Sequence, residues 1–169
     1  MLLRILANTP AWVWGLLAAL IALGVSQLFT RRAGMARIMI LPVAMTALAV
    51  FGLLSAFGAA ALALLLWCAT AALAARWIAR RPPPARTLYD AATRRFTLPG
   101  SALPLAIILG IFFTKYAVGV LLALQPGLAA QAGFAAGVAA LYGLFSGVLA
   151  GRALRLWRLA QQPADASAP

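Results

Sequence analysis

Long apolar stretches make up most of this chain, and polar residues interrupt them at only a few places. A helix needs about 20 apolar residues to cross the hydrocarbon core of a membrane. Five stretches reach about this length, and we expect them to form transmembrane helices at residues 12–29, 38–54, 59–77, 103–124 and 130–149. The second and third belong to one apolar run, which is too long for a single span and which we expect to fold back at residues 55–58.

The composition excludes an ordinary soluble domain. Hydrophobic residues make up 65% of the 169 residues, charged residues make up 9%, and the mean hydropathy is +0.99. Soluble domains are about 45–50% apolar and about 25% charged, and disordered chains have the opposite imbalance. The predicted fold class is therefore all-α, a polytopic transmembrane helix bundle with five spans. We expect one transmembrane domain over residues 1–160, with a cytoplasmic loop at 78–102 and a disordered tail at 161–169.

The distribution of charge predicts the orientation in the membrane. Lysine and arginine number 14 against two acids, Asp90 and Asp165, which gives a net charge of +12. Twelve of the basic residues fall on one side of the predicted spans, and only Arg4 falls on the other. Because basic loops stay in the cytoplasm, we expect the N-terminus outside and the C-terminus in the cytoplasm. Clusters placed between apolar stretches do not form the polar basic surface of a nucleic-acid-binding protein, so we expect no nucleic acid partner.

The first apolar stretch resembles a signal peptide in its basic residue and apolar run. Its apolar part is too long, however, and no small-residue cleavage site precedes Arg31. We therefore expect it to remain in the protein as a span.

The cytoplasmic loop allows two interpretations. After a stiff Pro82-Pro83-Pro84 spacer, residues 86–96 are either a short interfacial helix or a solvated basic loop that only fixes the topology. In either case anionic lipid headgroups on the cytoplasmic side are the expected partners of the basic residues. The predicted lipid contacts are Arg86, Arg94, Arg95, Arg152, Arg155 and Arg158.

Lys115 is the most unusual residue, because it lies near the middle of the predicted fourth span. An ammonium group at this depth costs about 2.5–3.5 kcal/mol on insertion scales, and no acidic residue lies within any span. Tyr142 and Ser146, spaced to share one face of the fifth span, are candidate partners. The three residues form either a site that binds an anionic ligand or relays a proton, or a set of interhelical hydrogen bonds without further function.

Three glycines repeat at every fourth position of the fifth span: Gly143, Gly147 and Gly151. Small residues with this spacing let a second helix approach closely. The second helix belongs either to the same chain or to another membrane protein or a second copy of this one.

Features of enzymes are missing from the sequence. The chain has no histidine, one cysteine, no paired carboxylates, no Gly-x-Ser-x-Gly motif and no phosphate-binding loop. We expect no enzymatic activity, no cofactor and no metal site.

Several segments resemble a known bacterial family. They are the opening LANTPAWVWGLL at residues 6–17, FTLPGS at 96–101, GIFFTKYAVG at 110–119, LYGLFSG at 141–147 and GRALRLW at 151–157. Together they are similar to a family of small multi-pass inner-membrane proteins of unknown function. The resemblance implies the cytoplasmic membrane of a Gram-negative bacterium and implies no activity.

Two functions are compatible with this sequence. The first is an accessory or assembly protein that packs against other membrane helices. The alternative is a small transporter or anionic-ligand-binding membrane protein with a site around Lys115.

Overall fold

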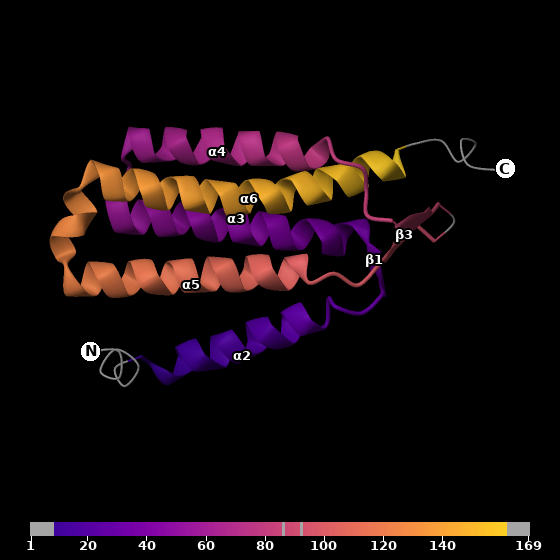
Figure 1. The fold of residues 1–169 in the computed structure, drawn as a ribbon, viewed down its shortest axis with the longest axis horizontal. Coiled ribbons are helices and arrows are strands. Elements are labelled where there is room, and N and C mark those ends of the chain that lie inside the picture. Colours follow the sequence, from indigo (N-terminus) through magenta and orange to yellow (C-terminus); the bar gives the residue numbers. More distant parts are fainter. Residues whose placement is uncertain (1–8, 86, 92, 162–169) are drawn as a thin grey trace. The chain divides into compact units, whose positions relative to one another are not determined.

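The computed structural model describes residues 9–85, 87–91 and 93–161. These residues form five α-helices, one 3-10 helix and three short strands (Figure 1). The helices are α2 (Ala11–Val25), α3 (Met35–Phe57), α4 (Ala61–Ala79), α5 (Leu103–Leu124), η1 (Pro126–Ala130) and α6 (Ala132–Ala160), and the strands are β1 (Arg31–Gly34), β2 (Leu88–Asp90) and β3 (Arg95–Leu98). The predicted helical fold class is confirmed. Of the predicted disordered tail, residues 162–169 lie outside the described part of the chain.

Four of the helices are long and apolar enough to cross a membrane: α3, α4, α5 and α6. Helix α2 has 15 residues, fewer than the roughly 20 that a span needs. It ends four residues before the predicted boundary at residue 29. Beyond it, the carbonyl of Gln27 accepts a 3.0 Å hydrogen bond from the amide of Ser101, so this backbone pairs with a distant segment.

Helix α6 extends well past the predicted boundary at residue 149 and ends at Ala160. The apolar run ends at Arg152, but arginine and leucine are good helix formers. The end of the apolar run therefore does not end the helix.

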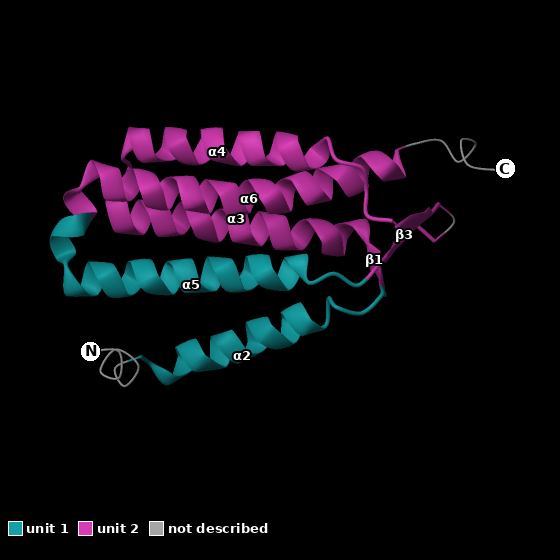
Figure 2. Cartoon of the chain, viewed as in Figure 1, with its two compact units in different colours: residues 1–30, 100–128 teal, residues 31–99, 129–169 magenta. Residues whose placement is uncertain are grey.

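The chain divides into two compact units (Figure 2). The first unit contains residues 1–30 and 100–128, with α2 and α5, and the second contains residues 31–99 and 129–169, with α3, α4, α6 and the strands. The division of the chain into one transmembrane domain over residues 1–160 stays a prediction.

Helices α2 and α5 run antiparallel in the first unit. Near one end of the pair, Gly24 lies against the side chain of Leu105. Near the other end, the hydroxyls of Thr9 and Tyr116 are 2.7 Å apart and share a hydrogen bond. Gly100 lies against the backbone carbonyl of Leu28, so a side chain at residue 100 would displace the segment that follows α2.

Helix α6 is the central helix of the second unit, because it carries most of the buried residues. A continuous face of α6 is buried from its first turns to its last: Ala135, Val138, Ala139, Tyr142, Gly143, Ser146, Gly147, Leu149, Gly151, Ala153 and Leu156. Helices α3 and α4 both pack against α6. The turn between α3 and α4 begins at Gly58, whose φ of 64° and ψ of −161° lie in a region open almost only to glycine.

The three strands form one small antiparallel sheet in the order β1-β3-β2. Phe96 at its centre lies opposite both Ala33 and Tyr89, and the rings of Tyr89 and Phe96 are 4.7 Å apart. Phe96 is 0% exposed and Ala33 is 5% exposed. One face of the sheet is therefore buried.

This sheet is neither the interfacial helix nor the solvated loop that were the two interpretations of residues 86–96, because the described residues of this segment include β2 and part of β3. The residues of β3 favour strands, and they pair with β1, which lies far away in the sequence. The hairpin turn is closed by the carboxylate of Asp90, which accepts hydrogen bonds from the hydroxyl and the amide of Thr93 at 2.7 and 3.3 Å. Arg94 has a φ of 51°, so a right-handed helix cannot continue through this residue.

Candidate functional site

Lys115 lies on α5, in the first unit, close to the middle of that helix. The next residue, Tyr116, stacks its ring on Phe112 at 6.3 Å and shares a hydrogen bond with Thr9. The sequence did not indicate Thr9 as a partner of α5, because it precedes the first apolar helix and no pattern connects the two. This hydroxyl pair lies one residue from the predicted intramembrane cation.

Tyr142 and Ser146 lie on α6, in the second unit, and both are buried. The hydroxyl of Ser146 donates a 2.8 Å hydrogen bond to the backbone carbonyl of Tyr142. Ser146 therefore uses its hydroxyl within its own helix. Because Lys115 belongs to the other unit, the predicted three-residue site stays a prediction.

The glycines of α6 lie against α4 of the same chain. A Cβ atom at Gly151 would lie 2.7 Å from the carbonyl oxygen of Ala75, closer than packing allows. Residue numbers rise together along both helices, so α4 and α6 are parallel: Gly143 lies against Trp67 and Thr70, Gly147 against Ala71 and Ala74, and Gly151 against Ala75 and Ile78. The glycine face is thus occupied by an intramolecular helix contact.

Two of the predicted lipid-binding arginines have partners within the protein. Arg155 donates from Nη1 to the carbonyl of Pro82 at 3.0 Å, and Arg158 donates from Nη1 to the carbonyl of Ala79 at 3.3 Å. Cations near a helix C-terminus interact favourably with its dipole, so these contacts stabilise the end of α4. A third cation also lies there, because the guanidinium of Arg81 is 4.0 Å from the ring centroid of Trp77.

The other predicted lipid contacts are not among the arginines that bond to the end of α4. Arg94 and Arg95 are exposed on the hairpin, and Arg152 is half-buried on α6. Arg86 lies outside the described residues.

Arg31 is a basic residue that the sequence did not single out. Side chains alternate between the two faces of a strand, and in β1 Arg31 is half-buried on the same face as the buried Ala33, whereas Arg32 is exposed. Burial and the nearby positive charge of Arg37 lower the pKa of the Arg31 guanidinium. An inward-facing strand arginine can be recognised only once the strand itself is known.

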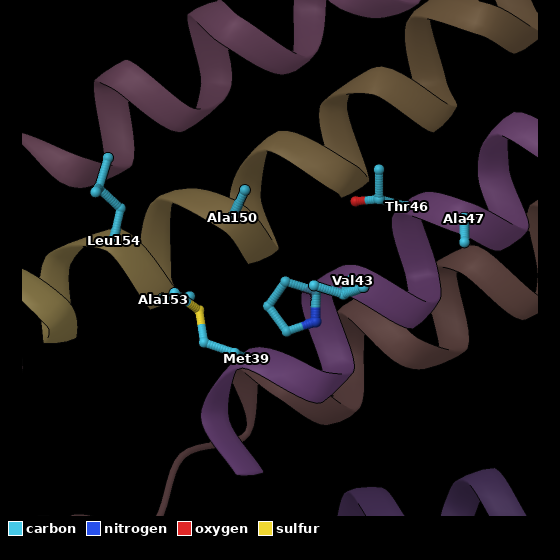
Figure 3. A pocket seen from close by; sticks show the side chains of 8 residues that line it. Met39, Val43, Thr46, Ala47, Ala150, Ala153 and Leu154 are labelled. Atoms are coloured by element: carbon cyan, nitrogen blue, oxygen red, sulfur yellow. The ribbon is translucent and has the colours of Figure 1, made fainter. Parts of the chain in front are cut away.

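An apolar groove runs between α3 and α6 in the second unit (Figure 3). Its volume is about 460 Å³. Pro42 and Ala153 are buried at its base, while Val43 at its edge is 66% exposed. The lining consists of Met39, Pro42, Val43, Thr46, Ala47, Ala150, Ala153 and Leu154. Small side chains on both helices leave this space open.

Comparison with known proteins places the chain in a family. A model of a family of unknown function, DUF6622, matches residues 1–167. The chain belongs to this family. No curated protein and no solved structure matches it. The resemblance to a family of unknown function is confirmed, and this membership assigns no activity to the groove or to the arginines.

Proposed function

We propose that this member of DUF6622 is a multi-pass protein of the bacterial inner membrane, with its N-terminus outside and its C-terminus in the cytoplasm. In that membrane it acts as an accessory or assembly protein that packs against helices of another membrane protein. Four apolar helices of spanning length support the membrane location. The gathering of basic residues on one side of the predicted spans supports the orientation. We assign it no enzymatic activity and no cofactor, since the sequence has no histidine and no paired acids.

The groove between α3 and α6 is the observation that favours this function. Helices associate in lipid through close packing of small residues rather than through the hydrophobic effect. The glycine face of α6 is already occupied by α4, whereas the groove is open at Val43 and has alanines on both helices. A side chain or helix ridge of a partner protein fits a space of this size and chemistry.

A photo-crosslinking amino acid at Val43 tests the proposal in living cells. Val43 is 66% exposed in the groove, and Leu65 is 67% exposed on α4 away from it, so the same substitution at Leu65 is a control of matched exposure. We expect Val43 to give one discrete adduct with another membrane protein, and Leu65 to give none.

Identical adducts at both positions would show non-specific contact and would contradict the proposal. An adduct of two copies of this chain would replace the proposed partner with self-association.

The second candidate function, transport or binding of an anion, is favoured by the position of Lys115 alone. For this function we expect Lys115→Met to unfold at the same temperature as the parent or higher, because the substitution removes the cost of an ammonium group within the membrane. The measurement is thermal unfolding in detergent with a panel of small anions. An anion that stabilises the parent should not stabilise Lys115→Met, and Lys115→Arg should keep part of the response.

A lower unfolding temperature for Lys115→Met, with no anion that stabilises the parent, would mean that the lysine makes structural hydrogen bonds. The transport function would then be dropped.

A further inference from the structure

Three arginines from two helices gather at the end of α4. Arg155 and Arg158, near the end of α6, donate hydrogen bonds to the carbonyls of Pro82 and Ala79 at 3.0 and 3.3 Å. Arg81 lies between these two acceptors in the chain. The three residues that hold the cluster on the α4 side, 79, 81 and 82, lie within roughly 5 Å along the direction of the helix. Hydrogen bonds and chain position therefore bring three guanidinium groups to one helix end.

The ends of α4 and α6 also carry two exposed tryptophans. Both helices are apolar and long enough to cross a membrane, and because they run parallel, both end on the same side of the second unit (Figure 1). Trp77, in the last turn of α4, is 59% exposed, and Trp157, in the last turn of α6, is 42% exposed. Indole side chains favour the level of the lipid headgroups. In the membrane location proposed above, the three arginines lie at that level.

The positive charge of the cluster is larger than the negative charge around it. None of the three guanidinium groups is paired with a carboxylate among the described residues. Of the two acids in the sequence, Asp90 ends β2, and Asp165 lies outside the described residues. The C-terminal ends of α4 and α6 supply about half a negative charge each, which leaves about two positive charges at the cluster. An anion would compensate them.

The protein holds these side chains in place and leaves most of their donors for a ligand. A guanidinium group has five N–H groups, and Arg155 and Arg158 each donate from Nη1 to one backbone carbonyl. The Nε atom of Arg155 is buried, so this side chain reaches a ligand through its Nη groups. The guanidinium of Arg81 lies over the ring of Trp77, 4.0 Å from its centroid. Side chains that are already held in place lose less entropy when a ligand binds.

We propose that Arg81, Arg155 and Arg158 bind the phosphate group of an anionic phospholipid where α4 and α6 end together. Guanidinium groups bind phosphate through two parallel hydrogen bonds. The exposed ring of Trp77 beside Arg81 offers an apolar surface to the part of the lipid between the phosphate and the acyl chains. Free phosphate has the same charge chemistry but makes no use of this surface. The proposal rests on the membrane location above and not on the accessory role.

The test compares three ligands on the purified full-length chain in a neutral detergent. Thermal unfolding, followed by far-ultraviolet circular dichroism, is measured with phosphatidylglycerol, with phosphatidylcholine of the same acyl chains, and with inorganic phosphate. We expect saturable stabilisation by phosphatidylglycerol and none by the other two. Equal stabilisation by phosphatidylcholine would overturn the recognition of charge, and equal stabilisation by inorganic phosphate would overturn a lipid as the ligand. Absence of any stabilisation would overturn the site but not the accessory role, which crosslinking at Val43 tests separately.

Substitutions then locate the binding. We expect Arg81→Gln and Arg158→Gln each to weaken phosphatidylglycerol binding by about tenfold or more, as for a lost hydrogen bond to a charged group. Arg76→Gln is the matched control, because Arg76 is an exposed arginine in the last turn of α4 that makes none of the contacts above. There we expect less than about a twofold effect, since salt screens an exposed charge. Equal effects at Arg76 and Arg81, whether large or small, would overturn the site.

Two further measurements separate binding from folding. Arg155→Lys keeps the charge but loses the paired donors, so we expect phosphatidylglycerol binding between that of the parent and that of Arg155→Gln. Binding equal to that of the parent would overturn a paired hydrogen bond from this residue. Without lipid, Arg81→Gln should unfold at nearly the same temperature as the parent, because Arg81 is exposed and donates no hydrogen bond to the described part of the protein. A clear decrease would show that Arg81 has a structural role and would overturn it as a lipid contact.

Discussion

Replacing Phe96 by alanine is expected to lower the free energy of unfolding by about 3–5 kcal/mol. Phe96 is 0% exposed at the centre of the sheet, and it contacts Tyr89 across the strands. Removing a buried ring loses its transfer free energy and leaves a cavity that a short sheet cannot close. Net stabilities of about 5–15 kcal/mol are usual for folded proteins, so this loss is a large fraction of the total free energy of unfolding. Unfolding in mixed micelles of increasing sodium dodecyl sulfate measures it.

Leu88→Ala provides the control, since Leu88 belongs to the same sheet but is 66% exposed. We expect less than about 0.5 kcal/mol there, as for most exposed substitutions. Tryptic cleavage after Arg94 and Arg95 should accelerate in Phe96→Ala and not in Leu88→Ala, because both arginines lie in the hairpin. Similar losses of stability for the two variants would mean that the sheet is not a packed element.

Gly147→Ala is expected to destabilise the contact between α4 and α6 by about 1–3 kcal/mol, the usual cost of overpacking. The added Cβ would meet the backbone carbonyl of Ala71 and would lie 2.8 Å from the Cβ of Ala74. A backbone atom cannot rotate away as a flexible side chain can, so the two helices must separate. The same unfolding measurement in mixed micelles detects the change.

The control for this variant lies on the same helix. At Gly137 a new Cβ would have nothing within 4 Å, so Gly137→Ala should leave stability unchanged or raise it slightly through the better helix propensity of alanine. If Gly147→Ala is as stable as Gly137→Ala, the close approach of α4 and α6 is refuted.

The helices could be predicted from the sequence where the hydrophobic run and the helix end together. Helix α5 occupies the predicted residues 103–124. Pro104 lies in its first turn, and Gln125-Pro126 ends both the apolar run and the helix. At α2 and α6 the apolar run and the helix end at different residues. Backbone pairing between Gln27 and Ser101 ends the first helix early, and good helix formers carry the last one beyond its apolar part.

The sheet could not be predicted because its central pairing is not local. Strand β1 has only four residues and pairs with β3 more than sixty positions later. Alternation over so few residues, two of them Arg31 and Arg32, gives no recognisable strand pattern. In the sequence, these two arginines were interpreted only as basic residues that fix the orientation in the membrane. That interpretation did not indicate that the side chain of Arg31 lies on the buried face of the strand.

Prediction of functional residues was limited by the same lack of long-range information. Spacing along one helix identified the glycines of α6 as packing residues, and their neighbours on α4 lie against them. Spacing along helices could not reveal that Arg31 lies on the buried face of β1, because this strand was not predicted. Arg155 and Arg158 were expected at the lipid surface, and they also bond to carbonyls at the end of α4.

The parallel arrangement of α4 and α6 determines when their contact can form during synthesis. Because both helices end on the same side of the second unit, the chain that follows the end of α4 must come back to the side where α4 begins before α6 can start. Helix α4 is therefore synthesised well before its partner, and the carbonyls of Ala71 and Ala75 cannot contact the glycine face until α6 has been made. Docking of the glycine face is a late step of biogenesis. A chain truncated before Gly143 would present an unpaired helix to the proteases that remove unassembled membrane proteins.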